Sequence, residues 1–171
     1  MARVFEEYVS GWEGPGDVLK LGREGVDSLF GKLGLVWRAD YFWHLQEELA
    51  EQWAGSVPEE TEDLQALPGV GSYVSAATRI YAFGVSETAV DANVLRILGR
   101  VYGIEFPDHA RRSPRVLRWA SAHCPGPDES ARAFNWGLVD LGSKVCSPED
   151  PQHEECPVAN RCWLAGEGRG S

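Results

Sequence analysis

The chain contains no run of about 18 apolar residues, the length that a membrane-spanning helix requires. Its first residues, MARVFEE, do not lead into the apolar stretch that is typical of a secretion signal. The sequence therefore predicts a cytoplasmic protein that has no membrane partner.

Positive charge is scarce, because the formal net charge is -10 and there are three lysines beside thirteen arginines. Proteins bind a phosphate backbone mainly through Lys and Arg, so this balance argues against a nucleic-acid partner. Seven of the arginines nevertheless lie between positions 79 and 118, where the local sign of the charge can differ from the net sign. The acidic residues at 47–62 and 149–155 are either solvated faces or an adaptation to high salt, and both interpretations stay open.

Cysteine is also rare, with four in the chain. In a chain without an export signal, cysteines are better explained as metal ligands or buried thiols than as disulfides. Three of them, Cys146, Cys156 and Cys162, fall within 17 residues. Cys124 lies apart from these and is predicted to be a buried thiol. Three of the four histidines do not fall in a recognisable ligand or catalytic motif and are predicted to be structural or surface residues: His44, His109 and His123.

Sustained strand-like alternation is missing as well. Apolar residues instead recur at helical spacing, which predicts short helices around 4–12, 26–33, 41–53, 74–81 and 94–101. A chain of 171 residues with 43% hydrophobic content can bury a core. We therefore predict an all-α helical bundle that is monomeric and consists of a first segment at 1–107 and a second at 108–171. The last 26 residues are too polar to hold a core, so ligand residues are the candidates to organise them.

A glycine-containing segment, LPGVG at 67–71, lies between two predicted helices. Gly69 and Gly71 allow the backbone to turn sharply and leave the first amides of the next helix pointing outward, which suits a phosphate. Such hairpins hold DNA without reading its sequence, because phosphate contacts position rather than specify. An ordinary helix-helix turn is the competing interpretation.

Asp91 stands one helix after this hairpin, at the start of VDANVLRILGR. By itself, an aspartate in this place is most simply an N-cap that accepts backbone N–H bonds. Beside a hairpin that grips DNA, the same carboxylate can stabilise the positive charge on a deoxyribose whose glycosidic bond breaks, or position the attacking water. Both functions require the ionised form.

Three segments taken together resemble one enzyme family: LPGVGSYVSAATRIYAFG, VDANVLRILGR and FNWGLVDLGSKVC. They are similar, in the same order, to the helix-hairpin-helix DNA glycosylases, which include endonuclease III, the A/G-specific adenine glycosylases and the thymine mismatch glycosylases. The resemblance covers the chain from about Val4 to Cys162. It implies a helix-hairpin-helix fold, a C-terminal iron-sulfur loop, and double-stranded DNA with a mismatched or damaged base as the partner.

The resemblance also implies the site residues. Asp91 takes the position of the catalytic aspartate, and Asn93 takes the polar position beside it. Tyr73 stands where endonuclease III has the lysine that attacks the sugar, and tyrosine forms no Schiff base at neutral pH. A glycosylase without lysine-dependent lyase activity is thus implied, with a packing function for Tyr73 as the alternative.

DNA contacts follow in the same way. The implied DNA-binding residues are Leu67, Gly69, Val70, Gly71, Ser72, Arg96 and Arg100. The carbonyl groups near Leu67 and Val70 resemble those that hold a monovalent cation in family members. Arg96 and Arg100, four residues apart on one helix face, either meet the DNA backbone or pair with acids.

Family members of the endonuclease III type hold a 4Fe-4S cluster with the pattern C-x6-C-x2-C-x5-C. This chain has the same spacing with one substituted ligand: Cys146, His153, Cys156 and Cys162. Imidazole can ligate iron in a cluster, so a Cys3His cluster is chemically reasonable. Tetrahedral zinc is the competing occupant. A third interpretation leaves His153 free on an acidic loop.

The family fold ordinarily begins with two further helices, one of which carries a catalytic glutamate in adenine and mismatch glycosylases. We expect that this sequence begins too late to contain them. The wording VDANV and the lack of a downstream 8-oxoguanine domain favour T or U opposite G as the substrate, with adenine opposite G or 8-oxoguanine next. A catalytically inactive DNA-binding or redox-sensing member of the family is the alternative.

Overall fold

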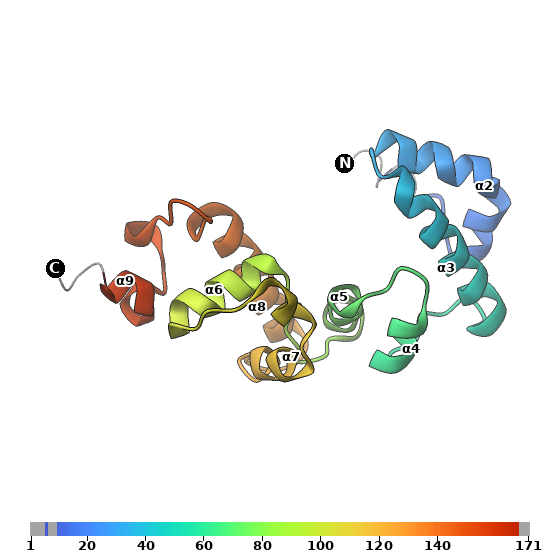
Figure 1. The fold of residues 1–171 in the computed structure, drawn as a ribbon. Helices are drawn as coiled ribbons and strands as arrows, with labels where there is room; N and C mark the ends of the chain where they lie inside the picture. The colour runs from blue at the N-terminus through green and yellow to red at the C-terminus, as the bar shows by residue number, and fades with distance from the viewer. Residues whose placement is uncertain (1–5, 7–9, 168–171) are drawn as a thin grey trace. The chain divides into compact units, whose positions relative to one another are not determined.

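The computed structural model describes residue 6 and residues 10–167, and these residues form helices and no strands. The predicted all-α class is therefore confirmed. No helix in this part of the chain is long and apolar enough to cross a membrane. The chain divides into two compact units, Met1–Gly71 and Ser72–Ser171, each of which is described below by itself (Figure 1).

The first unit contains two long helices that pack against each other, followed by a short one. Its elements are α2 (Pro15–Lys32), η1 (Val36–Arg38), α3 (Ala39–Gln52) and α4 (Thr61–Ala66). Helix α2 is kinked at Gly22, where φ is 77°. Between α2 and α3 the buried residues Val18, Val26 and Ala39 form one small core, ringed by half-buried aromatic side chains. Leu49, Leu64 and Leu67 form a second core, which joins α3 to α4 and to the start of the hairpin.

The second unit is built around one strongly amphipathic helix, α6. Its elements are α5 (Ser72–Phe83), α6 (Ala92–Tyr102), η2 (Asp108–Arg112), α7 (Pro114–Ser121), α8 (Glu129–Asp140), the π-helical turn η3 (Leu141–Val145), η4 (His153–Glu155), η5 (Ala159–Arg161) and α9 (Trp163–Glu167). Helix α6 buries Val94, Leu95, Ile97 and Leu98, a spacing that presents one apolar face. The core around this face includes α7 and α8.

At the end of α6, both the backbone conformation and the packing require a glycine. Gly103 ends the helix in the left-handed conformation, with φ at 66°, which glycine adopts at little cost. A Cβ atom at this position would lie 2.8 Å from the ring of Trp163. The close approach of α9 to the end of α6 thus depends on a residue without a side chain.

The helix expected at 4–12 falls mostly outside the described residues. The boundary expected after Pro107 differs from the division of the compact units at Gly71. The boundary after Pro107 stays a prediction.

Candidate active site

An extended segment, held by side chains of α7 and α8, leads into Asp91. The Thr88 amide donates to Ser121 Oγ at 3.1 Å, and Thr88 Oγ1 donates to the Ala120 carbonyl at 3.1 Å. The Ala89 amide donates to Asn135 Oδ1 at 3.0 Å. Thr88 and Asn135 are both buried, so these bonds are shielded from water. They fix the place at which α6 begins.

Asp91 is the N-cap of α6, and its carboxylate is held by two N–H donors. Oδ1 accepts the Val94 amide at 2.8 Å, and Oδ2 accepts Asn93 Nδ2 at 2.9 Å. The helix N-terminus also favours a negative charge at this position. The capping interpretation and the catalytic one are compatible, because capping leaves oxygen lone pairs for a further donor.

Asp91, Tyr73 and Asn93 line one small pocket of the second unit. Its volume is about 10 Å³, close to the space that one water molecule needs. Asp91 is half-buried, whereas Tyr73 is 43% exposed. The structure thus brings together the three residues predicted to be catalytic. Their roles stay predictions.

Tyr81 of α5 lines the same pocket and was not singled out from the sequence. Burial raises the pKa of its phenol, and the neighbouring Tyr73 raises this pKa further. Its ring packs against Trp136 of α8, with 5.0 Å between the ring centroids. The i, i+8 spacing of Tyr73 and Tyr81 on one helix was the only available signal.

Arg96 and Arg100 reach the segment that follows α8. Arg96 donates to the Cys146 and Gly142 carbonyls, both at 2.9 Å, and to Asn93 Oδ1 at 3.0 Å. Asn93 thereby links Arg96 to Asp91. None of these contacts is with an acidic side chain. Binding of Arg96 to the DNA backbone stays a prediction.

Arg100 makes a similar set of contacts one turn later. Its guanidinium donates to Cys146 Sγ at 3.3 Å and, at 2.6 Å each, to the carbonyls of Ser147 and Pro148. These bonds attach the polar C-terminal segment to α6. For Arg100 too, the described contacts are with carbonyls and a thiol, and DNA binding stays a prediction.

The hairpin lies at the end of the first unit. The Val70 amide donates to the Leu67 carbonyl at 3.2 Å, which closes the turn. Gly69 has φ at 75°, and a Cβ atom there would lie 2.9 Å from Tyr41 Cβ. At Gly71 a Cβ atom would meet none of the described atoms within 4 Å. Packing therefore requires glycine at position 69 and leaves the surface open at position 71.

The four predicted metal ligands line one cavity of about 20 Å³ between α6 and the C-terminal segment: Cys146, His153, Cys156 and Cys162. The Cys162 thiol donates to the Arg100 carbonyl at 3.4 Å. Within residues 6 and 10–167, no three His, Cys, Asp or Glu side chains are arranged to share a metal ion. The four donors border one cavity, and metal binding by them stays a prediction.

The other cysteine and histidines have ordinary surroundings. Cys124 is half-buried, with its thiol 3.6 Å from the Gly126 carbonyl. His44 contacts Glu47 at 2.9 Å, and the ring of His123 packs against those of Tyr102 and Trp119. His109 is exposed. The three histidines therefore have the structural or surface positions expected for them, whereas Cys124, expected to be buried, is half-buried.

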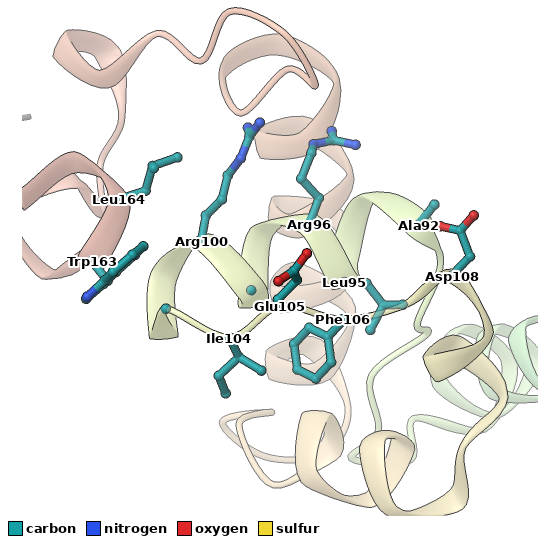
Figure 2. A pocket seen from close by; sticks show the side chains of 12 residues that line it. Ala92, Leu95, Arg96, Arg100, Ile104, Glu105, Phe106, Asp108, Trp163 and Leu164 are labelled. Carbon is teal, nitrogen blue, oxygen red and sulfur yellow. The ribbon is translucent and has the colours of Figure 1, made fainter. Parts of the chain in front are cut away.

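A much larger groove, of about 550 Å³, runs along another part of α6 (Figure 2). Gly99 and Gly103 lie along it, and Trp163 and Ile104 border it. Neither Asp91 nor Tyr73 lines this groove. Arg96, Arg100, Glu105 and Asp108 line the groove, so it is charged, but the three residues predicted to be catalytic line the small pocket instead.

Known proteins similar to this chain are DNA glycosylases. No protein-family model matches the sequence. The chain is 30% identical to a thymine/uracil-DNA glycosylase of Pyrobaculum aerophilum, over 92% of this chain and 69% of the relative. It is also 30% identical to a thymine-DNA glycosylase of Aeropyrum pernix, over 95% and 74%. An adenine DNA glycosylase of Mycolicibacterium smegmatis is 30% identical over 94% and 54%.

Solved structures agree with this pattern. A thermostable thymine-DNA glycosylase superimposes with a TM-score of 0.87 at 27% identity, over 96% of this chain and 76% of that chain. Endonuclease III in a non-covalent complex with DNA gives a TM-score of 0.77 at 24% identity, over 99% and 77%. The second likeness establishes a shared fold alone.

Proposed function

The chain belongs to the helix-hairpin-helix DNA glycosylase superfamily, and on this basis we propose how its residues excise a base. It is a DNA N-glycosylase of base excision repair, a hydrolase that acts on the N-glycosidic bond of a mismatched base. T or U opposite G is the favoured substrate, supported by the thymine/uracil- and thymine-DNA glycosylases above, and adenine opposite G or 8-oxoguanine is next, supported by the adenine enzyme. The DNA partner is a duplex that contains such a mismatch.

The observation that carries this proposal is the setting of Asp91. Its carboxylate is half-buried at a helix N-terminus and oriented by Val94 and Asn93. It shares a pocket of about the size of one water molecule with Tyr73. A fixed anion beside such a space suits a reaction in which positive charge develops and water attacks.

In the reaction, the bond between C1′ of the deoxyribose and the base nitrogen breaks as the sugar gains oxocarbenium character. Asp91 stabilises this positive charge and orients the water whose oxygen bonds to C1′. The water's proton passes to Asp91, and the leaving base takes up a proton from solvent. The products are the free base and an abasic site.

Tyr73 stands in place of the lysine on which strand cleavage depends. A lysine in this place would attack C1′ and form a Schiff base, which leads to strand cleavage. The phenol of Tyr73 instead faces the pocket from α5 and can donate a hydrogen bond to the sugar or a phosphate. The enzyme is therefore monofunctional and leaves the DNA strand intact.

The hairpin is proposed to hold the DNA backbone. The open surface at Gly71 allows a phosphate to approach the amides at the start of α5, around Ser72. The Leu67 carbonyl, together with that of Val70, is the proposed ligand of a monovalent cation. Arg96 and Arg100, which brace the C-terminal segment, are proposed to add positive charge for the DNA backbone.

The C-terminal segment is proposed to hold a 4Fe-4S cluster through Cys146, His153, Cys156 and Cys162. The donor set fits chemically, since three thiolates and one imidazole ligate iron-sulfur clusters and also zinc. All four residues border one cavity, which supports a common ligand. When bound, the cluster supplies bonds that fold a segment with little apolar core of its own.

The test is base excision by the metal-loaded protein. Duplexes with G:T, G:U and A:8-oxoguanine pairs are incubated with it, and half of each sample is then treated with alkali. Alkali-dependent nicks at G:T or G:U are expected, without nicks in the untreated half. Intact strands on every substrate after alkali would refute the proposed function.

A further inference from the structure

Exposed arginines line the outer side of α7 and the end of the short helix η2 before it. This arginine row consists of four residues: Arg111, Arg112, Arg115 and Arg118. The sequence from 109 to 127 contains no Asp or Glu, although the whole chain has a formal net charge of -10. The inner side of α7 packs into the core around α6 through Val116, Leu117 and Ala120. The row is therefore a local excess of positive charge on the surface of the second unit.

The side chains of the arginine row have no partner in the protein. Within residues 6 and 10–167, no hydrogen bond or ion pair joins any of its four guanidinium groups to another residue, including Asp108 at the start of η2. All five N–H donors of each group thus remain available to an external anion. The arginines of α2, α5, α6 and α8, in contrast, are engaged with acids or carbonyl groups: Arg23, Arg79, Arg96, Arg100 and Arg132.

The chemistry of the row suits a phosphate backbone better than a protein surface. The guanidinium fork matches two oxygen atoms of a phosphate. A protein partner would need an apolar or aromatic anchor at the centre of the contact, and no large apolar side chain of residues 105–135 is exposed. A chain with this net charge repels DNA over most of its surface, so binding requires a local concentration of positive charge.

The arginine row lies within reach of a duplex held at Asp91. The end of α7 is tied to the segment before Asp91, because the Thr88 amide donates to Ser121 Oγ at 3.1 Å. Three residues separate Thr88 from Asp91, and Arg118 lies about one turn before Ser121, so Arg118 is at most about 25 Å from Asp91. A duplex covers that distance in about seven base pairs.

We propose that the arginine row is a second contact with the phosphate backbone of the substrate duplex, on the flank of the mismatch. The row holds the flank by charge and reads no base, because phosphate contacts position rather than specify. The inference rests on the proposed function for the identity of the partner. It also accounts for the way in which an acidic chain binds DNA.

The experiment measures fluorescence anisotropy of a labelled G:T duplex of about 30 base pairs, with the full chain and over a series of salt concentrations. Arg115→Gln combined with Arg118→Gln removes two proposed phosphate contacts. This variant is expected to bind at least tenfold more weakly at about 0.1 M salt, and the slope of log affinity against log salt should fall by about two. Both side chains are exposed, so the Tm should stay close to that of wild type.

Two further variants serve as controls. Lys20→Gln combined with Arg23→Gln removes the same charge, but these two side chains are already paired with acids of α2 and α3. Its affinity for the duplex should stay within about twofold of wild type, since such exposed pairs add little positive field. Arg115→Lys combined with Arg118→Lys keeps the charge and should keep the salt slope.

The inference is overturned if the glutamine variant of the row binds the duplex with the affinity and salt slope of the Lys20 and Arg23 control. It is also overturned if the lysine variant loses as much slope as the glutamine variant, because charge is then not the cause. Anisotropy reports binding without excision, so the two proposals fail separately. If the wild type excises no base while the glutamine variant still loses affinity and slope, the proposed function fails and the arginine row remains a DNA contact.

Discussion

Alanine at Gly71 separates the function of the hairpin in DNA binding from its function in the fold. A Cβ atom at this position meets none of the described atoms within 4 Å, so the substitution costs no packing. Removing backbone freedom from the unfolded chain can even stabilise a protein by about 0.4–1 kcal/mol. The proposed phosphate, in contrast, must approach the amides where the new methyl group would stand.

The matched variant is Gly69→Ala, two residues earlier. Its φ of 75° costs a non-glycine residue about 1–2 kcal/mol, and the Cβ atom lies 2.9 Å from Tyr41 Cβ. Tyr41 Cβ is held by the backbone of α3, so the hairpin itself has to shift, and the total cost is roughly 1–3 kcal/mol. Gly69→Ala should therefore lower the free energy of unfolding, whereas Gly71→Ala should not.

The assay combines urea unfolding with fluorescence anisotropy of a labelled G:T duplex at one fixed salt concentration. Gly71→Ala is expected to bind the duplex at least tenfold more weakly, with an unfolding midpoint no lower than that of wild type. Binding as tight as that of wild type would refute the proposed phosphate contact at Gly71. A Gly71→Ala variant less stable than Gly69→Ala would refute the assignment of the packing constraint to position 69.

Three further predictions follow from the same contacts. Tyr73→Lys places an amine at the pocket, so borohydride should trap a covalent complex with a G:T duplex. If no complex is trapped, the side chain at position 73 does not contact the reacting sugar. Because the pKa of Tyr81 is raised above its ordinary value of 10.0, its contribution to stability is present below pH 10 and lost as pH rises further. The Tm of Tyr81→Phe should then fall less between pH 9 and 11 than that of wild type, and parallel curves would contradict this. Cys156→Ala should lose bound iron and lower the Tm, whereas His153→Cys should keep iron and sulfide in elemental analysis. Zinc without iron in the wild-type protein would contradict the proposed cluster.

Several elements were predictable because short-range chemistry determines them. The apolar spacing of Val94, Leu95 and Leu98 predicts α6, and its burial is as expected. Asp91 at the start of this helix is a favoured N-cap, and the structure shows the bond to Val94. The loss of helical period after Cys146 likewise corresponds to short helical turns.

Long-range contacts were not predictable from the sequence. The spacing of Arg96 and Arg100 indicates one helix face but not that both donate to carbonyls about 46 positions later. Asn135 lies in a helical pattern, and only the fold shows that its amide holds the segment before Asp91. A glycine at position 103 predicts a helix end, but the contact of this glycine with the ring of Trp163 depends on where α9 packs. Each of these contacts joins segments that are far apart in the sequence, and local sequence patterns do not predict such pairings.

The central claim is that the Asp91 carboxylate, fixed at the start of α6, drives base excision. Asparagine caps helices about as well as aspartate, so Asp91→Asn should keep the Tm of wild type within a few degrees. The decisive measurement is the single-turnover excision rate of Asp91→Asn and wild type on the same G:T and G:U duplexes. Asp91→Asn is expected to excise about 100-fold more slowly, or slower still, at equal DNA affinity. An excision rate equal to that of wild type would contradict it.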